Sequence, residues 1–351
     1  MEFLAIDYRS PSFSIAMLLI VIAVTALIDH LFGVYKERQQ NKKLSNFLSR
    51  FEGARRSTDY KNVLELQPDS VNALILLTNI YYKSGDYAES IKICLALLDI
   101  LADENERVFV MTRLAGAYHK AGFLQRSRDI LLESLRLKNR NPEALKLLLV
   151  IYEQMREYKS ALDVLPALQE LGENVAMERE FIQANVVIGD AFLSVEKKLE
   201  RLKEMQDRSP FLHRLVVEFA FLHDHVKAWN VIKGERLIDA IDLFWFLPRK
   251  SYIESEALKY PLLREMYTAK RWQNSAEGSG IFEFDLLIKL KDSEPSAVVE
   301  FEYRCEKCCS LFPMHFYRCP NCQKLGVAAV EAILAKKSAP LKGGAEEINF
   351  D

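Results

Sequence analysis

The chain has 351 residues, of which half are hydrophobic and 27% are charged, and this balance excludes a largely disordered protein. Its formal net charge of −2 provides no overall attraction to nucleic acid or to anionic lipid. We therefore expect a folded protein of two or three domains that does not bind nucleic acid.

Residues 11–35 predict a transmembrane anchor. An uncharged run of sixteen residues extends from Phe13 to Ile28, and the apolar pattern resumes after His30 and continues to Tyr35. Sixteen helical residues reach only about 24 Å, whereas a helix continued to Tyr35 is long enough for a hydrocarbon core of about 30 Å. A cleaved signal peptide and a buried core helix are the alternatives.

Basic residues flank this segment unequally. Arg9 is the one that precedes it. Seven follow it: Lys36, Arg38, Lys42, Lys43, Arg50, Arg55 and Arg56. Basic flanks stay in the cytoplasm, so we expect a single-pass anchor with the C-terminal part facing the cytoplasm. A cleavable signal peptide carries its positive charge before the apolar run, which favours an uncleaved anchor.

Residues 36–272 are expected to form an α-solenoid of helical repeats. Six positions recur three times with a period near 34 residues. They are Leu77, Tyr81, Gly85, Tyr87, Ser90 and Cys94; then Leu114, Tyr118, Gly122, Leu124, Ser127 and Leu131; then Leu148, Tyr152, Arg156, Tyr158, Ala161 and Leu165. The pattern resembles the tetratricopeptide repeat, in which small residues let two antiparallel helices approach and glycine permits the turn. We interpret the other positions, Cys94 included, as core.

After Gly172 the repeat pattern decays. A weaker copy is expected at Leu215, Phe219, Ala228 and Ile232. Solenoids bind other proteins along a concave face, but no ligand-binding residue stands out here. His223-Asp224-His225 could suggest a metal motif, although a turn between two helices explains it better. The chain has no phosphate-binding glycine loop, Gly-x-Ser-x-Gly or His-Glu-x-x-His motif, so no catalytic residue is assigned and no enzyme is expected.

Five of the six cysteines lie within eighteen residues near the C-terminus. Cys305, Cys308, Cys319 and Cys322 form a Cys-x-x-Cys…Cys-x-x-Cys pattern, which is the spacing of a four-thiolate metal site. Each pair can direct two sulfurs at one ion from a single tight turn. Disulfides or unliganded thiols are the alternative, although disulfide scaffolds spread their cysteines through small secreted domains.

Four thiolates fill a tetrahedron, so the predicted site is structural. Zinc is the expected metal, and iron, which would make a rubredoxin-like electron carrier, is the alternative. Cys309 occupies a position where such knuckles usually have glycine, because the backbone turns left-handed there. It could compete with Cys308 as a ligand, be a reactive thiol or be a spectator. His315 is a further possible ligand.

The knuckles are expected within a small zinc ribbon at 281–335. Residues 273–280 are polar and predict a linker. Alternation between Phe282 and Leu290 suggests a strand, with a helix as the alternative, and 298–304 predicts a second strand. Residues 325–334 could form a closing strand or a short helix, and 336–351 is expected to be a mobile tail.

The order of anchor, repeats and knuckle pair resembles the lipopolysaccharide assembly protein B (LapB) family of Gram-negative bacteria. The most specific local match is Tyr303-Arg304-Cys305-x-x-Cys308 followed by Cys319-Pro320-x-Cys322. The resemblance covers the whole chain in order of parts, and only the knuckles and about three repeats in detail. This chain departs from the family at Cys309, in its degenerate central repeats and in residues 273–300, which look inserted.

The resemblance implies an inner-membrane adaptor with a rubredoxin-like terminal domain packed against the repeats. Members of this family present the lipid A deacetylase of the committed step to a membrane-bound ATP-dependent protease, and so limit lipopolysaccharide synthesis. Two alternatives are a scaffold for another envelope or secretion complex and a rubredoxin-type electron carrier.

Overall fold

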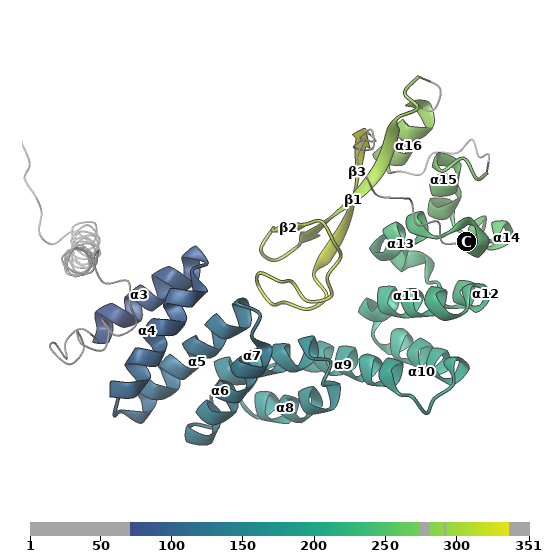
Figure 1. Ribbon diagram of the computed structural model, residues 1–351. Coiled ribbons are helices and arrows are strands. Elements are labelled where there is room, and N and C mark those ends of the chain that lie inside the picture. Colours follow the sequence, from purple (N-terminus) through teal and green to yellow (C-terminus); the bar gives the residue numbers. More distant parts are fainter. Residues whose placement is uncertain (1–70, 274–280, 291–292, 337–351) are drawn as a thin grey trace, which may run out of the picture. The chain divides into compact units, whose positions relative to one another are not determined.

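The computed structural model describes residues 71–273, 281–290 and 293–336 (Figure 1). The predicted anchor at 11–35 and its basic flank lie outside these residues, as does the tail beyond Lys336. Among the helices that are described, none is both long and apolar enough to cross a membrane. The contacts divide the chain into two compact units, Met1–Leu147 and Leu148–Asp351.

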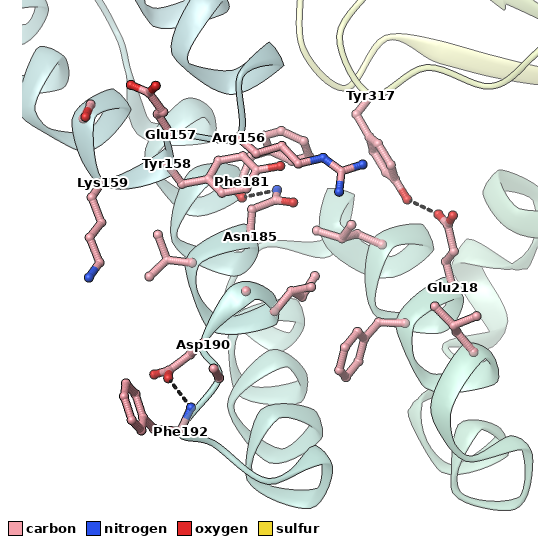
Figure 2. A pocket seen from close by; sticks show the side chains of 18 residues that line it. Arg156, Glu157, Tyr158, Lys159, Phe181, Asn185, Asp190, Phe192, Glu218 and Tyr317 are labelled. Carbon is pink, nitrogen blue, oxygen red and sulfur yellow. Dashed lines mark hydrogen bonds between the residues drawn. The ribbon is translucent and has the colours of Figure 1, made fainter.

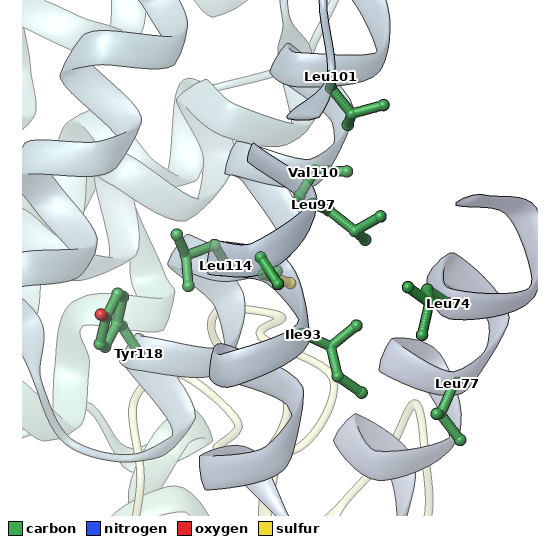
Figure 3. Packing of buried hydrophobic residues seen from close by; sticks show 10 residues of the cluster. Leu74, Leu77, Ile93, Leu97, Leu101, Val110, Leu114 and Tyr118 are labelled. Atoms are coloured by element: carbon green, nitrogen blue, oxygen red, sulfur yellow. The ribbon is translucent and has the colours of Figure 1, made fainter. Parts of the chain in front are cut away.

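The part of the first unit that the structure describes, from Val71 onward, consists of helical hairpins. Its helices are α3 (Val71–Ser84), α4 (Tyr87–Ile100), α5 (Glu104–Lys120), α6 (Leu124–Leu137) and the first part of α7 (Pro142–Gln154). Leu74, Ile93, Leu97 and Leu114 are fully buried where α3, α4 and α5 meet (Figure 3). Cys94 belongs to this cluster with 1% exposure, so its expected place in the core is confirmed.

The small residues at the recurring positions lie where two helices touch. Ser90 and Ser127 are fully buried. The Ser90 hydroxyl donates to the Thr78 carbonyl at 3.3 Å, and the Ser127 hydroxyl donates to the Ala115 carbonyl at 2.6 Å. Both bonds join residues twelve apart on paired helices, so the small side chain allows the approach and its hydroxyl satisfies a carbonyl.

The turn position of each repeat has a left-handed backbone. Gly85 and Gly122 both have φ of 84°, and Arg156 holds the same place with φ of 58°. The Arg156 N–H donates to the Glu153 carbonyl at 3.0 Å, which parallels the 3.0 Å bond from Gly122 to His119. A side chain in this conformation costs roughly 1–2 kcal/mol. The third turn therefore keeps the repeat geometry without its glycine.

The second unit continues with short helices. They are α8 (Tyr158–Glu170), α9 (Ala176–Gly189), α10 (Val195–Arg208), α11 (His213–His223), α12 (His225–Ala228), α13 (Ile241–Phe246), α14 (Glu254–Ala257), α15 (Pro261–Ala269) and α16 (Phe282–Leu290). Four 3-10 segments join them: η2 (Pro210–Leu212), η3 (Trp229–Val231), η4 (Gly234–Ala240) and η5 (Arg249–Ser251).

The weak repeat expected after Gly172 is only half formed. Helix α11 is complete, but its partner α12 has only four residues, and Ile232 lies beyond it. The chain instead turns into η3, where the buried Trp229 donates its indole N–H to the Ser251 carbonyl at 3.1 Å. Asp224 caps α12 by accepting from the N–H groups of Val226 and Lys227, so His223-Asp224-His225 is a helix junction, as expected.

A three-stranded antiparallel sheet follows. Its strands are β1 (Ala297–Cys305), β2 (Leu311–Phe312) and β3 (Ala328–Lys336), in the order β2-β1-β3. The predicted strand at 298–304 is confirmed. Of the two alternatives for residues 325–334, a closing strand and a short helix, the strand is confirmed, because β3 covers most of this segment. Phe301 lies on the buried face of β1, with its ring 5.8 Å from Phe246 and 6.3 Å from Trp245.

Residues Phe282 to Leu290 form α16, so the strand preferred for this segment is wrong and the helix alternative is confirmed. Phe284 is fully buried and stacks on Trp245 with ring centroids 5.5 Å apart. Leu287 and Ile288 follow at the i+3 and i+4 spacing of a helix face, and acidic residues in the first turn favour a helix start. Before this helix, Gln273 is buried and accepts from the Tyr252 hydroxyl at 2.7 Å, so it packs with the helices rather than beginning a linker.

Candidate metal centre and adjoining pocket

The four predicted cysteines come together. The sulfurs of Cys305, Cys308, Cys319 and Cys322 all lie within 4.8 Å of one another. Two pairs across the knuckles, Cys305–Cys322 and Cys308–Cys319, are 3.7 Å apart. A tetrahedron with metal–sulfur bonds of about 2.3 Å has sulfur–sulfur edges of about 3.8 Å, whereas a disulfide is about 2.05 Å long. All four are free thiols, so the cluster can hold a metal ion.

The two knuckles have the same backbone geometry. The Cys309 N–H donates to the Cys305 carbonyl at 2.9 Å, and the Gln323 N–H donates to the Cys319 carbonyl at 2.9 Å. Cys309 has φ of 57° and Gln323 has φ of 61°. The left-handed turn expected at Cys309 is therefore present. The sequence reasoning missed Gln323, although it holds the matching position after the second cysteine of its knuckle.

The other proposed ligands lie outside the cluster. Cys309 is exposed and does not belong to the four-sulfur group. His315 packs among aromatic rings, 5.0 Å from Tyr317 and 5.6 Å from Tyr303 between centroids. Burial, followed by the positive charge of Arg214, lowers the pKa of His315 to about 3. His315 is thus a neutral packing residue at physiological pH.

The cluster thiols differ in their surroundings. Burial raises the pKa of Cys319 to about 12. The side chain and backbone of Ser310 hydrogen-bond to Cys308 and lower its pKa to about 6. Because a coordinated cation deprotonates its thiol ligands, metal binding here releases protons and weakens at acid pH.

The second knuckle is attached to α7 by an ion pair. Arg318 donates from Nε and Nη2 to the two carboxylate oxygens of Glu153, at 2.7 and 2.6 Å. Its Nη1 donates to the Gln323 carbonyl at 2.7 Å, inside the knuckle. The two side chains are only 13% and 8% exposed. Burial raises the pKa of Glu153, and Arg318 opposes that rise. One guanidinium thus links the knuckle turn to the end of a helix.

A second buried network lies beneath the first knuckle. Arg214 of α11 donates to both carboxylate oxygens of Asp242 at 2.5 and 2.7 Å. The Tyr303 hydroxyl of β1 donates to the same carboxylate at 2.6 Å. Burial acts to raise the pKa of Asp242, but the bonds and charge of Arg214 outweigh it and hold that pKa below its ordinary value. The network ties the strand that leads into Cys305 to α11 and α13.

A pocket of about 1160 Å³ lies beside the second knuckle. Its walls come from the start of α8, from α9 and the loop after it, from α11 and from Tyr317 (Figure 2). The Tyr317 hydroxyl donates to Glu218 at 2.5 Å, and the Tyr317 ring lies 5.5 Å from that of Phe181. Burial, then Glu218, raises the pKa of Tyr317. Two apolar lining residues face solvent, Phe192 at 99% exposure and Leu222 at 79%.

Sequence reasoning did not find this pocket. Phe192, a large apolar residue in the loop between α9 and α10, was the available signal. The remaining lining residues are widely separated in the sequence, so only the fold brings them together.

No protein-family model matches the chain, and no curated protein matches it. The solved structures that are similar to the chain include two that cover half of it. "MamA RS-1 ArsTM double mutant" is 16% identical, with a TM-score of 0.39, over 50% of this chain and 96% of its own. "MamA 41-end from Desulfovibrio magneticus RS-1" is 17% identical, with a TM-score of 0.37, over 50% and 97%. The chain is a helical-repeat protein with a four-cysteine knuckle pair. The helical hairpins and the clustered cysteine sulfurs show this directly.

Proposed function

We propose that this protein is a non-enzymatic adaptor that binds other proteins through its helical repeats. The pocket carries this proposal, because Phe192 and Leu222 expose large apolar surfaces on its walls. Exposed apolar patches of this kind commonly mark interaction sites, and helical repeats offer extended binding surfaces. A four-thiolate centre leaves no open coordination position for catalysis, so it supports a structural role.

The proposal includes tethering to the inner membrane by residues 11–35, with the repeats on the cytoplasmic side. The long uncharged segment and its basic trailing flank support this arrangement. An anchor confines the repeats to the membrane surface, so a bound client meets a membrane partner at a raised effective concentration. A topology reporter placed after residue 60 tests the orientation, and periplasmic reporter activity would contradict it.

The resemblance to the LapB family suggests the partners. In this proposal the client is the deacetylase that commits carbon to lipid A, and the partner is a membrane-bound ATP-dependent protease. Depletion of the protein is then expected to lengthen the lifetime of the deacetylase. A Leu222→Asp variant should reproduce the effect, whereas Leu258→Asp, which also replaces an exposed leucine, should not. An unchanged lifetime after depletion would contradict the degradation role and favour a scaffold for another complex.

We also propose that the four cysteines hold structural zinc. The absence of other redox features in the sequence supports zinc over iron. Metal analysis of the purified protein should find one zinc per chain in a colourless sample. A red protein with one iron per chain would contradict the structural-zinc proposal and favour an electron carrier.

A further inference from the structure

One short segment belongs both to the metal centre and to the pocket. Tyr317 and Arg318 directly precede Cys319, the first cysteine of the second knuckle. Tyr317 bonds to Glu218 on α11 and forms one wall of the pocket (Figure 2). Arg318 bonds to Glu153 at the end of α7, three residues before Arg156, which also lines the pocket. The knuckle thus contacts two of the helical segments around the pocket.

The position of this segment depends on the knuckle turn. The Tyr317 carbonyl accepts from the Gly326 N–H at 2.8 Å, and Arg318 forms a β-bridge with Leu325. Arg318 also donates to the Gln323 carbonyl inside the turn. Cys322, a cluster cysteine, lies within the loop that these contacts close. A metal ion held by the four sulfurs would fix this turn. Because Tyr317 and Arg318 bond to the turn, it would also fix the positions of these two residues.

The knuckle also packs closely against α9. Gly326 has φ of 66°, and a Cβ built there would lie 2.8 Å from the Cε of Met177 on that helix. Met177 Cε is the end of a flexible side chain and can move aside, so it is the positive φ that favours glycine at this position. The knuckle turn thus packs against α9, the helix that supplies Phe181 to the pocket.

We propose that metal binding at the four cysteines and ligand binding in this pocket are thermodynamically linked through Tyr317 and Arg318. Small thiolate-bound knuckles take their fold from the metal. Metal loss releases Tyr317 from Glu218 and Arg318 from Glu153, so the pocket loses a wall and two carboxylates lose their partners. By reciprocity, a ligand that needs the closed wall tightens metal binding by the same factor. The inference rests on the proposed function only in treating the pocket as a binding surface.

A second set of contacts offers an alternative, in which the knuckle keeps its position after the metal is removed. The Arg214–Asp242–Tyr303 network fixes β1 independently of the sulfurs. If that network alone set the position of the knuckle, Tyr317 would keep its place after metal removal. Amide hydrogen exchange and metal affinity distinguish a knuckle held by the metal from one held by this network.

Amide hydrogen exchange of the full-length protein, with and without a strong zinc chelator, is the first measurement. Removing the metal should speed exchange at least about tenfold in α11 and in the last turn of α7. Exchange in α15 of the same unit, and in α4 of the other, should not change. Unchanged exchange in α11 would overturn the linkage. Loss of protection that includes α15 would also overturn it, because the metal would then be a general stabiliser.

The second measurement is metal affinity by competition with a chromophoric chelator. Tyr317→Phe keeps the ring against Phe181 and removes only the hydroxyl that bonds to Glu218. Glu153→Gln removes the charge that Arg318 pairs with. Each should weaken metal binding by about tenfold, although neither residue is a ligand. Glu196→Gln, which breaks an exposed ion pair with Lys227 in the same unit, should have no effect.

Unchanged metal affinity in both variants would overturn the proposal. If Glu153→Gln does not fold, unchanged metal affinity in Tyr317→Phe alone would overturn it. Neither measurement uses a protein partner. A failure of the linkage therefore differs from a failure of the adaptor function, which would appear as an unchanged client lifetime after depletion.

Discussion

Asp242→Asn tests whether the buried network beneath the first knuckle stabilises the second unit. Arg214 is 6% exposed and Asp242 is 2% exposed. The carboxylate accepts two bonds from Arg214 and one from Tyr303. Asparagine keeps one acceptor oxygen and removes the negative charge. The Arg214 cation is then left buried beside a neutral amide and the Asp239 carbonyl.

The expected loss follows from that burial. Removing one partner of a buried ion pair costs about 3–5 kcal/mol, and the retained acceptor places this variant near the lower end. For a unit of this size, 3 kcal/mol corresponds to a fall in Tm of about 6–12 °C. Tyr303→Phe removes one bond to a charged acceptor and leaves no charge unpaired. It should cost about 1.5 kcal/mol.

Tryptophan fluorescence during thermal and urea unfolding is a suitable assay. All three tryptophans, Trp229, Trp245 and Trp272, lie in the second unit, so the signal reports that unit. Asp207→Asn, which breaks an exposed ion pair with Lys233, should leave the unfolding midpoints unchanged. Arg214→Leu combined with Asp242→Leu should be more stable than Asp242→Asn, because no charge is left buried. A loss below about 1 kcal/mol for Asp242→Asn would refute the reasoning.

Three further predictions concern pH, the metal and the repeats. Because Asp242 has a folded pKa below its ordinary value near 3.8, its contribution to stability is present above that pH and is lost as the pH falls through the folded pKa. Urea unfolding between pH 3 and 6 should therefore show a smaller acid dependence in Asp242→Asn than in the parent protein, and equal slopes would contradict this. Cys308→Ser should abolish stoichiometric metal in elemental analysis, whereas Cys309→Ser should keep it; retention by Cys308→Ser would show that Cys308 is not a required ligand. Ser127→Val places a larger side chain in a fully buried site and removes the bond to Ala115, so it should destabilise the first unit by about 1–3 kcal/mol in far-UV circular dichroism. The exposed Gln125→Val in the same helix is the control, and equal effects would contradict the packing argument.

The features predicted from the sequence are those whose cause is local. The left-handed turns at Gly85 and Gly122, the buried Ser90 and Ser127, and the cysteine spacing each follow from a few neighbouring residues. Arg156 shows the strength of the repeat pattern, because it adopts the glycine conformation at an energetic cost. The cysteine spacing predicted that four sulfurs meet at one site, because each pair requires only one tight turn.

The features that were missed depend on tertiary context. The segment Phe282 to Leu290 alternates like a strand, but Trp245 provides a stacking partner for Phe284 that favours a helix. The pair Arg318–Glu153 joins residues 165 apart, and Tyr317–Glu218 joins residues 99 apart. No local pattern marks such partners, so the attachment of the knuckle and the pocket beside it required the fold.

In the proposed function, the pocket binds the client of a membrane-tethered adaptor. Site-specific photo-crosslinking in cells tests it most directly, with a photoreactive amino acid at Phe192 or Leu222 and a control at the exposed Phe246 outside the pocket. If the pocket binds this client, the lipid A deacetylase should be crosslinked from positions 192 and 222 and not from 246. Crosslinking of the deacetylase from 246 alone, or from none of the three positions, would contradict it.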